Sequence, residues 1–401
     1  MSEKLLAEYA VVGGGIIGLT IALEIAKRDP KATIHLYEKE TDPGTHASTR
    51  NSGVLHAGFY YAPNSLKAKL AVKGHELLKK FCLDYNLPLD QCGKVVVATN
   101  ADEAKQVLKL HERAAEVGVT TELVDISELS RIEPLAKSHE VALWSPMTSI
   151  GDSFAVLKQL EMLLPKNIQI RRKDEVRRID GNRLSATSGY GTYRHVINAA
   201  GAYANVLAEQ DGFCNDYLML PFRGVYWHAT KPTQRPSRLI YPVPNAKNPF
   251  LGVHLDRTVN GGLRAGPTAL PVLWRESYGG FKNFDLTDIL ATVPGFINLA
   301  TSDHHQTASF FRNEFLNLRK AHLFSEIAKI VPSVSPSEFK SKGRAGIRAQ
   351  LIHKESKQLE MDFIIRGNSD VTHVLNAVSP GWTSSFAFAE HVVTDLFGRL
   401  A

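Results

Sequence analysis

Three glycines near the amino terminus have the spacing of a phosphate-binding turn. Gly13, Gly15 and Gly18 form a G-x-G-x-x-G pattern, and Glu38 lies twenty residues after the last of them. In such a turn the first glycine allows a tight bend, the second lets the backbone approach a pyrophosphate, and the third lets a helix pack closely on a strand. An acidic side chain at the position of Glu38 accepts hydrogen bonds from a ribose. These residues therefore predict a dinucleotide-binding site.

The elements needed to position this site surround the glycines. Residues 9–12 form a short apolar run that is typical of a strand buried on both faces. Residues 17–25 carry apolar side chains at helical spacing, and Pro30 follows as a stop signal. Residues 33–37 form a second apolar strand that ends at Glu38. The strand, turn, helix and strand together predict a complete βαβ unit, whose helix N-terminus points N–H groups at the phosphates.

Two later parts of the chain add further strand–turn segments. One closes with the buried strand and turn at residues 195–201, and the other begins at His373 and continues into an apolar helix that runs to the C-terminus. We therefore expect an α/β dinucleotide-binding domain that is discontinuous, comprising residues 1–80, 147–217 and 340–401. Residues 81–146 and 218–339 are expected to form a mostly antiparallel α+β substrate domain, because a helix-like stretch at 101–117 lies among strand-like runs broken by proline and asparagine.

Composition narrows the class of protein. The 401 residues are 44% hydrophobic and 22% charged, as in an ordinary globular protein of two or three domains. Cys82, Cys92 and Cys214 form no CxxC pair, which argues against a metal site or a disulfide framework and favours the cytoplasm or another reducing compartment. The net charge of +6 comes without a dense basic stripe, so nucleic acid is not expected as a partner. We find neither a signal peptide nor an apolar run long enough to span a membrane.

Long stretches of unusual residues carry a family resemblance. They are NSGVLHAGFYYAPNSLKAKLAVKG (51–74), YPVPNAKNPFLGVHLDRTVNGGLRAGP (241–267), KGRAGIRAQ (342–350) and SPGWTSS (379–385). With the glycine turn, they resemble the flavin-dependent oxidoreductases of the D-amino-acid oxidase superfamily, and within it the L-2-hydroxyglutarate dehydrogenase/oxidase group. The resemblance implies an FAD-binding Rossmann-like domain of the glutathione-reductase type. One departure concerns Arg50, because that group has a histidine immediately before Asn-Ser-Gly.

The resemblance also implies which residues contact FAD. The loop after the second strand would run along the cofactor, which explains why residues 51–61 follow neither a helical nor a strand period. The turn at residues 379–384 would direct backbone N–H groups at flavin O2. The expected cofactor-binding residues are Gly13, Gly15, Ile17, Gly18, Glu38, Lys39, Ser48, Thr49, Arg50, Asn51, Ser52, Gly53, Val54, Val176, Ala200, Gly201, Gly381, Trp382, Thr383 and Ser384.

The implied reaction is oxidation of a small 2-hydroxy acid by hydride transfer to flavin N5, with L-2-hydroxyglutarate as the preferred substrate. Arg348 is expected to hold the α-carboxylate, since a guanidinium offers a bidentate fork. His254 is our first choice of general base and His56 the second. For each of these residues a structural role is the alternative: a surface ion pair, a solvent-facing edge-strand histidine, or a buried histidine bonded to carbonyls. The residues expected to bind substrate are Arg348, Tyr241, Tyr60 and Lys67.

Several alternatives stay open at this stage. Lys67, Arg50, Arg257 and Tyr241 are all candidates for a distal carboxylate. The same hydride step could act on an amino acid or amine, and a flavoprotein that only transfers electrons is a further alternative. A nicotinamide-dependent dehydrogenase is less favoured, because it has no use for the extra strand–turn segments. The electron acceptor could be oxygen, a quinone or a carrier protein.

One stretch suggests peripheral contact with a membrane. Residues 307–331 interleave aromatic and aliphatic side chains with arginines and lysines at helical spacing. A basic amphipathic helix of this kind lies on a bilayer in some proteins and packs on its own domain in others. The apolar members are Phe310, Phe311, Phe315, Leu318, Leu323, Ile327 and Ile330, and the basic members are Arg312, Arg319, Lys320 and Lys329.

Overall fold

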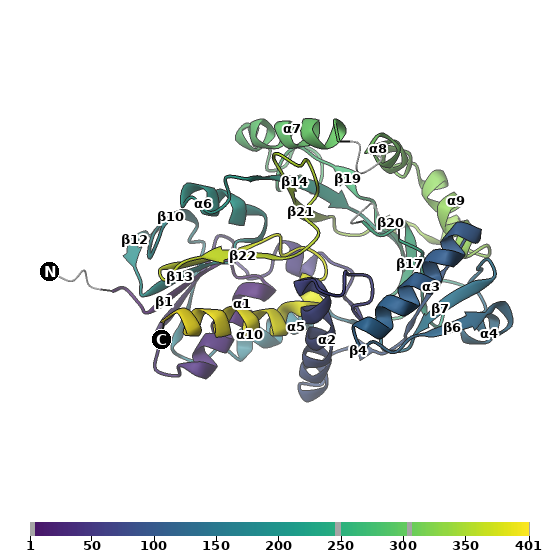
Figure 1. The fold of residues 1–401 in the computed structure, drawn as a ribbon, viewed down its shortest axis with the longest axis horizontal. Coiled ribbons are helices and arrows are strands. Elements are labelled where there is room, and N and C mark those ends of the chain that lie inside the picture. The colour runs from purple at the N-terminus through teal and green to yellow at the C-terminus, as the bar shows by residue number, and fades with distance from the viewer. Residues whose placement is uncertain (1–4, 245–249, 303–306, 401) are drawn as a thin grey trace.

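A computed structural model describes residues 5–244, 250–302 and 307–400 and contains two large sheets (Figure 1). The first has six strands in the order β22-β23-β13-β1-β2-β9. All neighbours are parallel except β22 and β23, which are antiparallel. The strands are β1 (Tyr9–Val12), β2 (Ile34–Glu38), β9 (Ile168–Arg172), β13 (His195–Asn198), β22 (Ile364–Gly367) and β23 (Val371–Leu375).

Both faces of this sheet are covered, which explains its continuous apolar strands. Tyr9 and Val11 face a core formed with α1, α2, α5 and α10, whereas Ala10 and Val12 face α6 and a β10-β11-β12 meander. The predicted βαβ unit and the α/β fold class are confirmed. The covering elements are α1 (Ile16–Arg28), α2 (Leu66–Asp84), α5 (Ser153–Met162), α6 (Ala204–Gln210), α10 (Gly381–Leu400), β10 (Val176–Asp180), β11 (Arg183–Ala186) and β12 (Gly189–Thr192).

The second sheet has eight strands in the order β20-β15-β18-β17-β16-β5-β7-β6 and lies on the right in Figure 1. It is antiparallel except for the pair β16 and β5. Val96 faces a core with α3, whereas Val95 and Val97 face one with α9. The elements are β5 (Lys94–Val97), β6 (Glu122–Asp125), β7 (Val141–Ser145), β15 (Trp227–Ala229), β16 (Leu239–Pro242), β17 (His254–Arg257), β18 (Leu263–Gly266), β20 (Ser341–Lys342), α3 (Ala101–Glu116), α4 (Ile126–Ile132) and α9 (Lys320–Ile330).

Smaller sheets connect the two large ones. β14 (Tyr217–Gly224) pairs over its whole length with β21 (Gly346–His353) and at one end with β19 (Leu270–Pro271). The strands β3 (Val54–Leu55) and β4 (Leu89–Asp90) both pair with β8 (Ser149–Gly151). The β14–β21 pair joins segments that we predicted for different domains, and β20 joins the eight-stranded sheet. The proposed domain boundaries stay a prediction.

The basic stretch at residues 307–331 forms two helices. α8 (Thr307–Leu316) ends before a turn, and α9 begins at Lys320. Leu323, Phe324 and Ile327 of α9 are buried against the eight-stranded sheet, so this part of the stretch packs on its own domain. No helix in the described ranges combines the length and apolar character needed to cross a membrane.

Candidate functional site

A large cavity lies between the glycine turn and the eight-stranded sheet. Its volume is about 1230 Å³. The turn after β1, the loop after β2 and the start of α10 line it from one side. Side chains of β16, β17 and β21 line it from the other. A space of this size holds a dinucleotide together with a small molecule.

The glycine turn at the nucleotide end leaves backbone exposed to the cavity. Gly13 has a φ of +106°, and a Cβ there would collide with the carbonyl of Ala199. A Cβ on Gly15 would meet only Oγ of Ser48, at 3.0 Å, within 4 Å. Ile16 donates its N–H to that same Oγ over 2.9 Å. The protein therefore leaves open the side of Gly15 from which a pyrophosphate would approach.

Glu38 ends β2 next to this turn. Its carboxylate accepts N–H bonds from Gly14 at 2.9 Å and from Glu40 at 2.8 Å, and burial raises its pKa above the ordinary value. Each carboxylate oxygen keeps a lone pair for a hydroxyl donor. The open glycine turn, this acidic group and the N-terminus of α1 together fit the adenosine half of FAD.

Most of the predicted cofactor-binding residues line the cavity, and three do not. Gly18 packs against the backbone of Gly13, Gly53 lies against Gly151, and Ser384 is buried in the first turn of α10. Their roles are to allow close packing next to the site. The lining members of the predicted set are Gly13, Gly15, Ile17, Glu38, Lys39, Ser48, Thr49, Arg50, Asn51, Ser52, Val54, Val176, Ala200, Gly201, Gly381, Trp382 and Thr383.

The loop that follows no period is held against the start of α10. Thr383 accepts the N–H of His56 at 3.1 Å and donates its hydroxyl to the carbonyl of Val54 at 3.2 Å. Asn51 accepts the N–H of Gly53 and donates to Ser48. These bonds shape the wall of the cavity, which is consistent with the predicted cofactor-contact segment.

The predicted substrate residues also converge on this cavity. His254, His56, Arg348, Tyr241, Tyr60 and Lys67 all line it. Arg348 lies on β21, its Nε donates to Gln350 at 3.2 Å, and burial lowers its pKa to about 10. Burial, together with the charge of Arg348, lowers the pKa of Lys67 to about 7. Arg257, by contrast, pairs with Asp90 at 2.9 Å and does not line the cavity.

His254 has a defined tautomer. Its Nδ1 lies 2.7 Å from the carbonyl oxygen of Gly252, which can only accept, so Nδ1 carries the hydrogen of the neutral ring. Its Nε2 is left with a lone pair, 3.5 Å from Oη of Tyr226 and 3.7 Å from Oδ2 of Asp256. The ring stacks on Tyr241 with centroids 3.8 Å apart.

Sequence reasoning missed two buried charges beside this histidine. Asp256 and Lys94 are each 0% exposed, and neither Nζ of Lys94 nor the Asp256 carboxylate has a hydrogen-bond partner among the residues that the structure describes. Nζ of Lys94 lies 4.1 Å from the centre of the Tyr241 ring, and burial lowers its pKa to about 8. His254 and Asp256 share one face of β17, since they are two residues apart. The two-residue spacing of His254 and Asp256 in a strand-like run was the sequence signal that could have placed this carboxylate beside the histidine.

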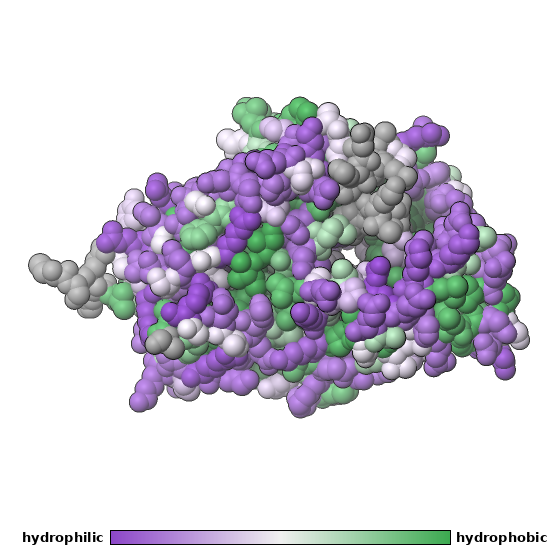
Figure 2. All heavy atoms as spheres, viewed as in Figure 1, coloured by the Kyte–Doolittle hydropathy of each residue, from purple (hydrophilic) through white to green (hydrophobic). Residues whose placement is uncertain are grey.

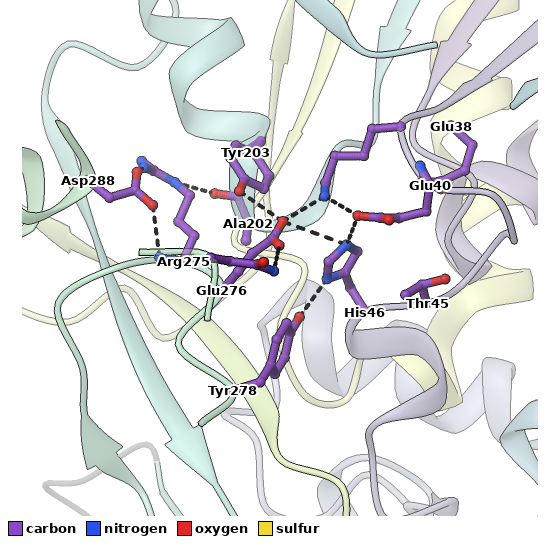
Figure 3. A network of polar contacts seen from close by, with 12 residues as sticks. Glu38, Glu40, Thr45, His46, Ala202, Tyr203, Arg275, Glu276, Tyr278 and Asp288 are labelled. Carbon is purple, nitrogen blue, oxygen red and sulfur yellow. Dashed lines mark hydrogen bonds and ion pairs between the residues drawn. The ribbon is translucent and has the colours of Figure 1, made fainter. Parts of the chain in front are cut away.

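The adenosine side of the cavity carries a network of ion pairs (Figure 3). Glu276 accepts from Lys39 at 2.6 Å and from the hydroxyl of Tyr203 at 2.9 Å. His46 contacts Glu40 at 3.0 Å and Oη of Tyr278 at 2.6 Å. Glu40, His46 and Glu276 lie close enough to hold a cation, but the ammonium of Lys39 already contacts both carboxylates. The network ties the 274–278 segment to the rim of the site.

Arg50, where related proteins were expected to have histidine, joins the same region. Its guanidinium carbon lies 4.1 Å from the centre of the Tyr278 ring. Its nitrogens donate to the carbonyls of Thr45 and Ala345. Arg50 thus has partners at the adenosine side, which argues against its use as a ligand for a distal carboxylate.

The fold and the cavity together define a flavin-dependent oxidoreductase. The family model described as "FAD dependent oxidoreductase" matches residues 8–395, and the chain therefore belongs to this family. The predicted family, the use of FAD and the enzyme class are confirmed.

Comparison with individual proteins identifies relatives whose names state an activity. The chain is 34% identical to the L-2-hydroxyglutarate dehydrogenase of Indibacter alkaliphilus, over 95% of this chain and 96% of that protein. It is 32% identical to the mitochondrial L-2-hydroxyglutarate dehydrogenase of Homo sapiens, over 98% and 89%. Among solved structures it is similar to L-alpha-glycerophosphate oxidase from Mycoplasma pneumoniae with FAD bound, with a TM-score of 0.77, 23% identity, and coverage of 97% and 94%. Glycine oxidase from Geobacillus kaustophilus gives a TM-score of 0.72 at 19% identity, covering 99% and 95%.

Proposed function

We propose that this protein oxidises a small 2-hydroxy acid with FAD, and that L-2-hydroxyglutarate, converted to 2-oxoglutarate, is the preferred substrate. The observation that carries this proposal is the convergence of a carboxylate-binding cation, Arg348, and a base, His254, on the cavity that the glycine turn opens into. Full-length identity to L-2-hydroxyglutarate dehydrogenases supports the choice of substrate. An enzyme that only relays electrons needs neither group.

Each group that lines the cavity has a separate role in the proposed reaction. Arg348 holds the α-carboxylate and so fixes the orientation of the carbon that loses hydride. Nε2 of His254 takes the hydroxyl proton, because its lone pair is free in the tautomer fixed by Gly252. Bound FAD supplies the two-electron oxidant that accepts the hydride. The N-terminus of α10, which lines the cavity, directs a positive dipole toward the charge that develops there.

The surrounding charges favour His254 over His56 as the base. A base becomes positively charged when it accepts a proton, so a nearby carboxylate assists it and a nearby cation opposes it. Oδ2 of Asp256 lies 3.7 Å from Nε2 of His254, where it assists protonation of that nitrogen in the reaction. Burial, followed by the charge of Lys94, holds the pKa of His56 well below its usual range. His56 therefore stays neutral and serves to shape the cavity.

We propose Lys67 as the ligand of the distal carboxylate. Lys67 is 2% exposed and lines the cavity, and the positive charge of Arg348 contributes to lowering its pKa. Although Asp362 and Glu360 partly offset the charge on Lys67, this residue and Arg348 place two cationic side chains on the wall of one cavity. A dicarboxylate supplies one negative group for each of them, which suits 2-hydroxyglutarate better than a monocarboxylate.

Anaerobic mixing tests the function without knowledge of the electron acceptor. The purified yellow protein is mixed with L-2-hydroxyglutarate, its D-enantiomer, other 2-hydroxy acids and a panel of amino acids. Fast bleaching of the flavin absorbance by L-2-hydroxyglutarate is expected. Faster bleaching by an amino acid would replace this proposal with the amine-oxidising alternative, and absence of bleaching by any member would contradict turnover of small acids.

We also propose peripheral contact with a membrane through the 307–331 stretch, and its first half supports this proposal. Phe315 on α8 and Leu318 in the turn after it are exposed beside the exposed Arg312 and Arg319. The apolar side of α9 is buried and unavailable for this role. Contact with a bilayer would bring the reduced enzyme close to a lipid-soluble acceptor such as a quinone.

A further inference from the structure

The helix α7 (Leu286–Ala300) packs on the protein with a side that mixes polar, small and apolar residues. Its buried positions include Asp288, Thr292 and Gly295. Asp288 forms an ion pair with Arg275 (Figure 3). A Cβ added to Gly295 would lie 2.7 Å from Cδ2 of Leu220, so the helix backbone lies close against β14. Leu299 and Phe296, nearer the end of the helix, pack against the core cluster around Phe222.

The outer side of α7 is apolar and exposed. Leu290 is 68% exposed and Ile297 is 57% exposed. In a surface helix of a globular protein, the outward side ordinarily carries charged and polar residues. The exposed stripe, spaced by three and four residues, consists of Leu286, Leu290, Val293 and Ile297.

The segment before α7 extends this surface. Phe281 is 84% exposed and Phe284 is exposed as well, with Lys282 between them. Apolar residues gather at the upper edge of the molecule in Figure 2, where Figure 1 places α7. Phe315 of the neighbouring α8 and Leu318, in the turn after it, add to them. Large contiguous apolar patches on a protein surface mark sites of interaction.

The charges around the apolar surface are mainly positive. Within residues 279–301 and 309–319, the exposed charged side chains are Lys282, Arg312, Arg319 and Asp285. Asp285 is the N-cap of α7 and accepts the N–H groups of Thr287 and Asp288. An anionic surface complements this distribution. A second copy of the chain, meeting the same patch, would bring like charges together.

We propose that α7 and the 281–284 segment dock on an anionic lipid bilayer. The apolar stripe of α7, with Phe281 and Phe284, enters the boundary between headgroups and acyl chains, and Lys282 and Arg319 contact the headgroups. This surface enlarges the membrane contact proposed for α8. The docking proposal does not depend on the proposed oxidation, because vesicle flotation reports membrane binding whether or not the flavin is reduced by a substrate.

Vesicle flotation of the FAD-loaded protein tests the proposal. We expect the protein to float with phosphatidylglycerol-containing vesicles at low salt and far less with pure phosphatidylcholine. The double variant Leu290→Gln/Ile297→Gln should lower the partition coefficient about tenfold or more, since two aliphatic side chains no longer insert. Phe315→Ser/Leu318→Gln separates the contribution of α8 and of the turn that follows it. Leu83→Gln, at a position 63% exposed on α2, is the matched control and should float like the parent.

Three results would overturn the proposal. The parent protein could stay at the bottom of the gradient with both kinds of vesicle. The Leu290→Gln/Ile297→Gln variant could float as well as the parent, with its flavin absorbance and melting temperature unchanged. The parent could be a dimer by light scattering that this variant converts to a monomer, without flotation. The last result would assign the surface to self-association.

Discussion

The carboxylate of Asp256 lies 3.7 Å from Nε2 of His254, and both side chains are buried in the eight-stranded sheet. Arg264, directly opposite Asp256 on β18, brings its Nη2 to 3.9 Å from the same oxygen. Although burial acts to raise the pKa of Asp256, His254 and Arg264 hold it below the ordinary value. The carboxylate is therefore charged at neutral pH and stabilises positive charge that develops nearby during proton transfer.

Removing the charge of Asp256 should slow flavin reduction. When His254 takes the hydroxyl proton its ring becomes positively charged, and a carboxylate oxygen 3.7 Å away stabilises that charge. Asp256→Asn should therefore slow the reduction step by about tenfold or more. His254→Ala should slow reduction by about 10² or more. Rapid anaerobic mixing measures both.

His56 provides the matched control. His56→Gln should reduce the flavin at nearly the parental rate, because the lowered pKa of His56 keeps this residue neutral. If Asp256→Asn reduces the flavin at the parental rate, or if His56→Gln slows reduction as much as His254→Ala does, the base is not His254.

Lys94 should leave a signature in the pH dependence of stability. Its pKa is about 8 in the folded protein, against about 10.4 in an unfolded chain. Below about pH 8 the lysine is protonated in both the folded and the unfolded state, and the cost of the buried charge is fully present. Between the folded-state and unfolded-state pKa values only the unfolded chain binds the proton, so the free energy of unfolding rises with pH. From pH 7.5 to 9.5 the parent should gain roughly 2 kcal/mol in unfolding free energy relative to Lys94→Met. Denaturant titrations at both pH values check this, and parallel curves for the two proteins would contradict it.

The nucleotide end of the site could be predicted from sequence because its signals are local. Gly13, Gly15 and Glu38 belong to one βαβ unit, in which turn, helix and strand specify one another within thirty residues. The loop at residues 48–54 could be placed only through the family resemblance, since its partners on α10 are distant in the chain.

The position of Lys94 could not be predicted, because strand register sets it. Lys94 pairs with Leu239 across β5 and β16, and this pairing sets its side chain beside Tyr241. Nothing near Lys94 in the sequence, which starts an apolar strand, indicates that contact. The orientation of α7 was likewise hidden, because leucine at positions 286 and 290 is equally typical of a helix that faces a core.

Substitution at Gly15 should remove FAD without unfolding the protein. A Cβ at Gly15 meets only Ser48 within the protein, so the bulk of valine projects into the space for the pyrophosphate. Gly15→Val should purify colourless, with the circular dichroism of the parent apoprotein and no rise in melting temperature when FAD is added. Gly398→Ala, where the added Cβ has no neighbour within 4 Å, should stay yellow. A yellow Gly15→Val protein would refute the assigned phosphate position.

Arg348→Lys should weaken substrate binding while preserving the charge. Lysine lacks the planar fork of the guanidinium, and loss of one charge-assisted hydrogen bond costs about 1.5–3 kcal/mol, or roughly 10- to 150-fold in KM. Arg257→Lys is the control, because Arg257 pairs with Asp90 outside the cavity and its replacement should leave KM unchanged. Equal effects of the two substitutions would remove Arg348 as the carboxylate clamp.

Lys67 should decide between dicarboxylate and monocarboxylate substrates. With a pKa of about 7, its ammonium is available at pH 6 and largely lost at pH 9. The KM for L-2-hydroxyglutarate should therefore increase over this range, although the bound dianion will itself favour the charged form and move the midpoint upward. Lys67→Met should raise that KM at pH 6 by about tenfold or more and abolish its pH dependence, while L-2-hydroxybutyrate, which lacks the second carboxylate, should be turned over as by the parent. If Lys67→Met weakens both substrates equally, Lys67 supports the cavity wall near Arg348 and the distal carboxylate binds elsewhere.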